Sequence, residues 1–147
     1  MSLRFAGVAL LGVVVGIGMG AASAAEHVVK MVNDNGKGDD MAFEPSFIAA
    51  APGDTVKFVV VDPGHNAETL PEIWPEGAKP FRGDFSKDVV LTVETEGVYG
   101  VKCLPHYGMG MMALIVAGKP VNEDQVKAFK PPAPAAKRFE AIAANLK

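Results

Sequence analysis

The chain has 147 residues, and its 14 lysines and arginines against 17 aspartates and glutamates give a formal net charge of −3 at pH 7. This mildly acidic balance argues against nucleic acid as a partner, because nucleic-acid-binding proteins carry a surplus of basic side chains on one face. There is one cysteine, so no disulfide can form within the chain. In an exported protein such a cysteine is a free thiol, an intermolecular bridge or a metal ligand.

The N-terminal segment predicts export. An uncharged apolar run covers residues 5–21, and Ala22-Ser23-Ala24 supplies an A-x-A cleavage pattern. We therefore predict a signal peptide over residues 1–24, with cleavage before Ala25 or before Glu26. The segment that remains keeps 13 basic and 17 acidic side chains, a formal charge of −4. No membrane segment is expected after cleavage.

Residues 25–147 are predicted to form one mostly β domain. Up to about residue 117, short β-prone runs alternate with Gly, Pro, Asn and Asp, as in an antiparallel sandwich or barrel. Val56, Phe58 and Val60 alternate with other residues and are expected to face the core. The expected strands are 27–32, 43–50, 55–61, 89–95, 98–103 and 112–117, with a loop at 33–40.

The C-terminal part changes to a helical pattern from about residue 122. Asn122 is expected to cap a short helix, with Gln125 at the reciprocal position of a capping box, and Pro131-Pro132 ends that helix. A second helix is predicted over residues 134–145, where apolar side chains recur along one helical face. We expect both helices to pack against the core.

One short loop holds Cys103, His106 and three methionines. A thiolate, an imidazole and a thioether within nine residues suit a soft transition metal, copper above all. The loop joins the predicted strands 98–103 and 112–117, so the β framework rather than the metal would hold the ligands in place. A copper site of this kind indicates that the protein transfers electrons.

A trigonal copper site needs a second imidazole, and the chain has three histidines. His65 follows the strand at 55–61 and can reach the same end of a sandwich as Cys103. His27 lies in a presumed edge strand, where a solvated histidine is expected. We therefore predict His65, Cys103 and His106 as metal ligands.

The spacing alone leaves the axial thioether open. Met109 gives C-x2-H-x2-M and Met111 gives C-x2-H-x4-M, and both are chemically feasible. Met112 begins the outgoing strand and is disfavoured. Gly108 and Gly110 make the loop backbone too permissive for the spacing to decide.

Three other functions compete with this hypothesis. Cys103 with His106 or His65 could serve a hydrolase, but no oxyanion-donor motif is evident. A structural zinc site would want further thiolates or a third histidine in place of a thioether. A carrier of Cu(I) could use Cys103 and the methionines, but it would need flexible surplus ligands rather than a rigid frame of two strands.

Six fragments of the chain together resemble one known family. They are Phe43-Glu44-Pro45, Pro52-Gly53-Asp54-Thr55, Gly64-His65-Asn66, Pro75-Glu76-Gly77-Ala78, Gly97-Val98-Tyr99 and Cys103-Leu104-Pro105-His106-Tyr107-Gly108-Met109-Gly110-Met111. Through them the chain is similar to the pseudoazurins, which are blue-copper proteins of the cupredoxin family. The similarity covers essentially all of residues 25–147, including the two C-terminal helices.

The resemblance implies a Greek-key β-sandwich or barrel of about eight strands with two C-terminal α-helices. It implies Met111 as the axial ligand, because pseudoazurins use the longer spacing, and it implies that Asn66 braces the cysteine segment by a hydrogen bond. One type 1 copper per chain would cycle between Cu(I) and Cu(II). The protein would then be a periplasmic electron carrier and not an enzyme.

The resemblance also implies how the carrier meets its partners. Electrons would pass through the imidazole of His106 and an apolar patch of Met41, Pro45, Pro105 and Met109. The implied partners are copper nitrite reductase, related enzymes of denitrification and cytochromes. Because a carrier must shuttle between its partners, we expect it to be a monomer.

A ring of lysines usually surrounds that patch in the family. This chain keeps Lys79, Arg82 and Lys102, but it has Asn35 and Pro63 where many relatives carry lysine. The basic ring is therefore expected to be thinner, with an effect on partner choice and not on the copper site.

Overall fold

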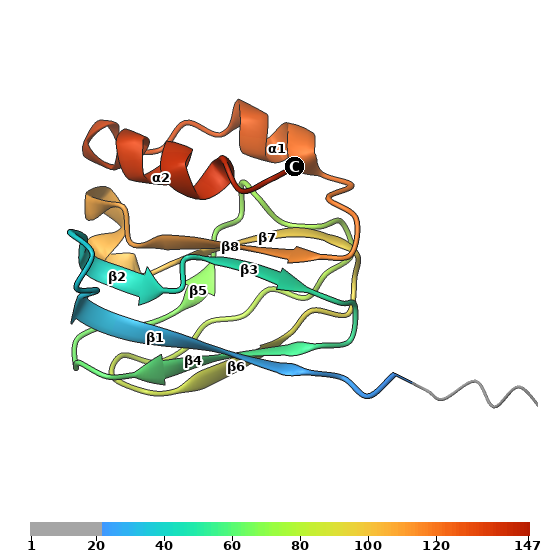
Figure 1. Ribbon diagram of the computed structural model, residues 1–147, viewed down its shortest axis with the longest axis horizontal. Helices are drawn as coiled ribbons and strands as arrows, with labels where there is room; N and C mark the ends of the chain where they lie inside the picture. Colours follow the sequence, from blue (N-terminus) through green and yellow to red (C-terminus); the bar gives the residue numbers. More distant parts are fainter. Residues whose placement is uncertain (1–21) are drawn as a thin grey trace, which may run out of the picture.

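The computed structural model describes residues 22–147, which form two stacked four-stranded sheets (Figure 1). One sheet has the order β2-β1-β4-β6 and contains β1 (Glu26–Asp34), β2 (Asp40–Glu44), β4 (Thr55–Val60) and β6 (Val89–Thr92). The other has the order β3-β8-β7-β5 and contains β3 (Phe47–Ala50), β5 (Glu68–Thr69), β7 (Gly97–Lys102) and β8 (Met112–Ala117). The predicted eight-stranded sandwich is confirmed, and these residues form no closed barrel.

Two short helices cover the outer face of the second sheet (Figure 1). They are α1 (Glu123–Ala128) and α2 (Ala136–Ala143), and a 3₁₀ turn, η2 (Ala133–Ala135), precedes α2. Phe139 and Ile142 of α2 are buried in one apolar cluster with Val98 and Leu114 of the sheet. The predicted pair of C-terminal helices is thus confirmed. Within residues 22–147, no helix has the length and apolar character needed to cross a membrane.

The predicted signal peptide, residues 1–24, lies almost wholly outside the described part of the chain. Two strand predictions are wrong in detail. The single strand expected at 43–50 is two strands, β2 and β3, which belong to different sheets. Pro45 lies between them and has no N–H for a sheet ladder, so the chain leaves one sheet there and enters the other. The expected loop at 33–40 is shorter, because Asp34 pairs with Asp40.

The predicted capping box of α1 is also wrong. Asn122 occupies the N-cap position, but its side chain makes no cap hydrogen bond. Instead, its Oδ1 accepts from the Val98 N–H at 2.7 Å, and its Nδ2 donates to the Val98 carbonyl at 3.0 Å and to Gln125 Oε1 at 2.8 Å. The buried amide therefore ties the start of α1 to β7.

His27 is engaged by a buried carboxylate and is not simply solvated. β1 lies between β2 and β4, but at His27 it pairs with β4 alone, and the ring Nε2 of His27 is 2.8 Å from Asp54 Oδ2. Asp54 also accepts hydrogen bonds from the backbone N–H groups of Ala25 at 2.8 Å and Ala51 at 2.9 Å. The bond from His27, followed by these two, lowers the pKa of Asp54 to about 2. This carboxylate holds the beginning of β1 at the end of the sandwich from which β4 starts.

We predict that Asp54 gives the protein part of its resistance to acid. A carboxyl group with a lowered folded-state pKa stabilises the fold above its unfolded pKa of about 3.9 and loses that contribution as pH falls toward about 2. In metal-free protein, Asp54→Asn should therefore flatten the fall in the free energy of unfolding between pH 5 and pH 2.5, measured by urea denaturation. Asp84→Asn, at an exposed site, is the control. An acid dependence equal to that of the unmodified protein would contradict the prediction.

Candidate metal centre

Three predicted ligands meet at one end of the sandwich. His65 lies in the loop that follows β4, Cys103 directly follows β7, and His106 lies in the 3₁₀ segment η1 (Leu104–Met109). Their candidate ligand atoms all lie within 4.8 Å of one another. His27, the remaining histidine, is engaged by Asp54 instead. The choice of His65 over His27 as the second imidazole at this end therefore agrees with the geometry.

The separations among the three ligand atoms fit a small metal ion. Cys103 Sγ is 3.5 Å from His106 Nδ1 and 3.8 Å from His65 Nδ1, and the two Nδ1 atoms are 3.1 Å apart. Imidazole nitrogen and thiolate sulfur bind ions such as Zn²⁺ at about 2.0–2.3 Å, so a trigonal arrangement places ligand atoms roughly 3.5–4 Å apart. The observed triangle lies close to that size, with a somewhat narrower angle between the imidazoles.

His65 is held by a hydrogen bond on the far side of its ring. Its Nε2 is 2.9 Å from Asn33 Oδ1, and the backbone N–H of Asn33 donates to Asp62 Oδ2 at 2.7 Å. Because Asn33 Oδ1 can only accept, Nε2 carries the proton and Nδ1 turns its lone pair toward Cys103. Burial, assisted by the neighbouring His106, lowers the pKa of His65 and favours this neutral form.

Cys103 is completely enclosed at the centre. Its side chain is fully buried, and its backbone N–H donates to the Met111 carbonyl at 3.0 Å. Burial raises the pKa of the Cys103 thiol, while hydrogen bonds from the backbone N–H groups of Asn66 and His106 oppose that shift. A bound cation reverses the balance, because a coordinating thiol loses its proton. The pocket therefore favours a neutral thiol in the free protein and a thiolate beside a metal.

Asn66 braces the chain next to Cys103. Its Oδ1 accepts from the backbone N–H of Leu104 at 2.8 Å, and its Nδ2 donates to Glu68 Oε2 at 2.9 Å and to the Gly83 carbonyl at 3.3 Å. This bond to the cysteine segment is the one that the family resemblance implied. The amide is buried, so its bonds are shielded from competing water.

The three methionines of the loop have different surroundings. Met111 is fully buried in the same apolar cluster as Cys103, and its backbone N–H donates to the His106 carbonyl at 3.2 Å. Met109 is 48% exposed. Met112 is buried in the other cluster, between the second sheet and the helices. Of the three, Met111 alone shares the interior with the cysteine.

Two residues that support the centre, Asn33 and Arg138, were not predicted as such from the sequence. Asn33 fell within a predicted loop, and Arg138 fell on a helix expected only to pack against the core. Arg138 Nη1 donates to the Met109 carbonyl at 3.1 Å, so α2 contacts the ligand loop directly. Arg138 is 29 residues from Met109 and Asn33 is 32 residues from His65, so neither pair leaves a local sequence pattern. For Asn33, the only available signal was a polar residue at the end of a strand.

Comparisons with known proteins identify the family. Residues 29–118 match the model of copper binding proteins of the plastocyanin/azurin family. The chain is 44% identical over 124 residues to pseudoazurin of Paracoccus pantotrophus, covering 84% of this chain and 85% of that one. The crystal structure of native pseudoazurin from Hyphomicrobium denitrificans is 50% identical with a TM-score of 0.80, covering 83% of this chain and 98% of that one. Pseudoazurin from Methylobacterium extorquens AM1 is 39% identical with a TM-score of 0.79, covering 83% and 99%.

The fold and the site define a cupredoxin, a copper-binding β-sandwich. The chain belongs to the plastocyanin/azurin family of copper binding proteins and, within that family, to the pseudoazurins. It is therefore a blue copper electron-transfer protein, an electron carrier rather than an enzyme. The resemblance noted from the sequence fragments and the expectation of copper as the cofactor are both confirmed.

We predict that removing the Asn66 amide destabilises this end of the sandwich. Asn66→Ala leaves the partly buried Leu104 N–H and the Gly83 carbonyl without this partner, which costs roughly 1–3 kcal/mol. Urea denaturation of metal-free protein should show that loss. Asn145→Ala, at an exposed amide near the end of α2, should change the free energy of unfolding by a few tenths of a kcal/mol. Equal effects of the two substitutions would contradict the special role of Asn66.

Proposed function

We propose that His65, Cys103, His106 and Met111 bind a single type 1 copper ion, and that the protein carries single electrons between periplasmic redox proteins. The observation that carries the proposal is the triangle of His65 Nδ1, Cys103 Sγ and His106 Nδ1, all within 4.8 Å, beside the buried Met111. When bound, copper supplies the one-electron chemistry, and the residues supply two imidazoles, a thiolate and a weak axial thioether.

The surroundings of the methionines support Met111 as the axial ligand. Its backbone is tied to both Cys103 and His106, at 3.0 and 3.2 Å, so its position is coupled to two other ligands. The exposed Met109 and the helix-facing Met112 lack this combination of burial and coupling. The three methionines therefore lie in three different surroundings. This arrangement disfavours a Cu(I) carrier, which would need its methionines to converge on one ion.

His106 is the proposed exit for electrons. It is half-buried, whereas His65 and Cys103 are fully buried. Leu104 and Met109 of the same loop are 42% and 48% exposed, which gives the surface beside His106 an apolar character. A small apolar contact suits a carrier that must dissociate quickly after each transfer.

The proposed partners are copper nitrite reductase, related enzymes of denitrification and cytochromes, each met by a monomeric carrier. The location is the periplasm, reached after cleavage of the signal peptide predicted over residues 1–24, with cleavage before Ala25 or Glu26. The family relationship and the A-x-A pattern of residues 22–24 support this location.

Glu68 neutralises two of the cations expected in a basic ring. Its carboxylate is 3.4 Å from Arg82 Nε and 3.9 Å from Lys102 Nζ. Lys79 is exposed and lines a small pocket with Thr92 and other residues at the opposite end of the sandwich, so it is not part of the ring. We therefore propose that partner docking depends more on apolar contact than on positive charge.

We predict that the protein loaded with Cu(II) is intensely blue or green and bleaches reversibly with a mild reductant. The colour requires a thiolate on the metal, so Cys103→Ser should abolish it, as absorption spectroscopy will show. A colourless Cu(II) form of folded, unmodified protein would refute the proposal.

The same measurement distinguishes the axial candidates. Met111→Gln should keep a coloured centre and lower its reduction potential, because an amide oxygen favours Cu(II) more than a thioether does. Met109→Leu is the matched control and should leave spectrum and potential unchanged. A change in the Met109→Leu spectrum as large as that of Met111→Gln would overturn the assignment of Met111.

We predict that Glu68→Gln accelerates oxidation by ferricyanide at low ionic strength. The substitution leaves Arg82 and Lys102 unneutralised and still offers Asn66 an acceptor, so an anionic oxidant should react about 2- to 10-fold faster. Stopped-flow rates should converge in 0.5 M salt, where screening removes the difference. Glu26→Gln removes an equal charge at the start of β1, at the other end of the sandwich, and should have a much smaller effect. Equal acceleration in both variants would contradict the role of Glu68.

A further inference from the structure

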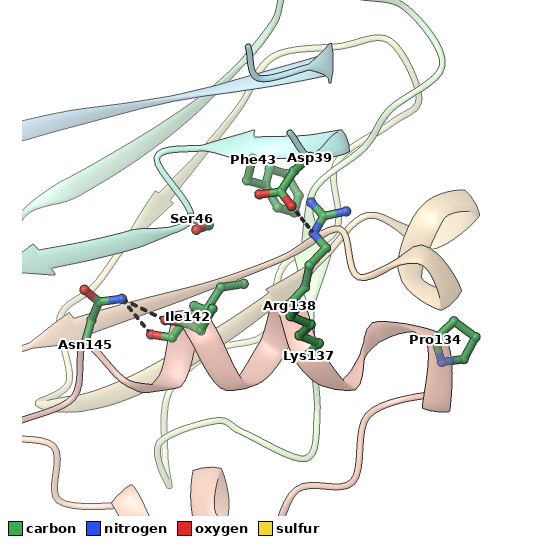
Figure 2. A pocket seen from close by; sticks show the side chains of 9 residues that line it. Asp39, Phe43, Ser46, Pro134, Lys137, Arg138, Ile142 and Asn145 are labelled. Atoms are coloured by element: carbon green, nitrogen blue, oxygen red, sulfur yellow. Dashed lines mark hydrogen bonds and ion pairs between the residues drawn. The ribbon is translucent and has the colours of Figure 1, made fainter. Parts of the chain in front are cut away.

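Arg138 of α2 joins three main-chain carbonyls that belong to two other parts of the chain. Its Nη1 donates to the Asp40 carbonyl at 2.8 Å and to the Met109 carbonyl at 3.1 Å, and its Nη2 donates to the Met41 carbonyl at 3.1 Å. Its Nε is 3.6 Å from Asp39 Oδ1, an ion pair shown in Figure 2. One guanidinium therefore connects the C-terminal helix, the start of β2 and the ligand loop.

The carbonyls in β2 lie where the sheet ladder is irregular. β2 is an edge strand, and its pairing with β1 passes from Asp34 with Asp40 to Val32 with Ala42. Met41, between these pairs, has a φ of 49°, in the left-handed region that side chains rarely adopt. The guanidinium of Arg138 thus contacts the carbonyls of Asp40 and Met41, at and beside the position where β2 lacks a paired residue in β1.

The third carbonyl belongs to the loop that carries the proposed ligands. Met109 is the last residue of η1, and Gly110 follows it with a φ of 94°. A Cβ added to Gly110 would lie 3.0 Å from Arg138 Cδ and 3.2 Å from Arg138 Cβ, so the stem of the arginine packs directly on the loop. Met111, the proposed axial ligand, is the next residue.

The three bonds demand a guanidinium rather than any cation. Arg offers a planar fork of N–H donors, whereas the ammonium of Lys is a compact point charge that cannot span separated acceptors in the same way. The Arg138 side chain is 21% exposed, so its hydrogen bonds are partly protected from water. Lys137 precedes it on α2 and is exposed, which provides a neighbouring cation for comparison (Figure 2).

We propose that Arg138 is a positioning residue that clamps the ligand loop to β2. By holding the carbonyls of Met109 and Met41, it fixes the spacing of two methionines on the electron-exit face and the backbone that leads into Met111. Its effect on the copper centre rests on the proposed ligand set. Its effect on the loop does not, because the contacts involve protein atoms alone.

The test is amide hydrogen exchange measured by NMR on the copper-loaded protein in its diamagnetic Cu(I) state. The Gly110 N–H donates to the Tyr107 carbonyl and the Met111 N–H to the His106 carbonyl, so both amides report opening of the loop. In Arg138→Gln both should exchange at least about 10-fold faster, while amides central to β7 and β8 keep their rates. Arg138→Lys should show a smaller acceleration, and Lys137→Gln should show none.

The visible spectrum of the Cu(II) form is the second readout, and its charge-transfer bands should shift in Arg138→Gln and stay unchanged in Lys137→Gln. Unchanged exchange at Gly110 and Met111, or acceleration by the same factor throughout β7 and β8, would overturn the proposal. If Arg138→Gln fails to fold, the same two exchange results in Arg138→Lys would overturn the proposal. If the unmodified protein binds no copper, the proposed function fails by itself, and exchange in the metal-free protein still tests the clamp.

Discussion

The centre depends on the hydrogen bond from the Cys103 N–H to the Met111 carbonyl, 3.0 Å long. It extends the antiparallel pairing of β7 and β8 by one step beyond Lys102 and Met112. The ligand loop is therefore closed at its base by the sheet itself. Because both ends of the loop belong to neighbouring strands of one ladder, the protein can hold a thiol and a thioether close together without a metal to attract them. Pre-organisation of this kind limits rearrangement when the charge of a bound ion changes.

Closing the base leaves the rest of the loop and the separate His65 to be positioned by other elements. Asn33 at the end of β1 orients the His65 ring, Asn66 holds the backbone after Cys103, and Arg138 reaches the far end of the loop from α2. Each support comes from a different element and acts on a different point. α2 contributes no candidate ligand, yet through Arg138 it contacts the loop that carries them.

How much of the site the sequence predicts depends on how far apart in the chain the interacting residues lie. The candidate ligands Cys103, His106, Met109 and Met111 lie within nine residues, and the predicted strand at 55–61 placed His65 at the same end of the sandwich. Those inferences needed only local spacing and the alternation of side chains. The supports from Asn33 and Arg138 were missed because they join residues 29 to 98 positions apart. The predictions for Asn122 and His27 were wrong because tertiary partners override the local rules on which they rested. Capping patterns describe an isolated helix, whereas the Asn122 amide makes hydrogen bonds to the backbone of Val98 in β7.

The imidazoles of His65 and His106 differ in burial. His65 is enclosed, and its second nitrogen is already engaged by Asn33, so that side of the centre is closed to a partner. His106 is only half-buried and is flanked by exposed apolar residues of its own loop. An electron leaving through His106 crosses less protein than one leaving past His65. The cations nearby are paired, with Arg82 and Lys102 on Glu68 and Arg138 on Asp39. This pairing of charges supports the proposal that partners are recognised mainly by shape and apolar contact, which permits rapid release at the cost of long-range attraction.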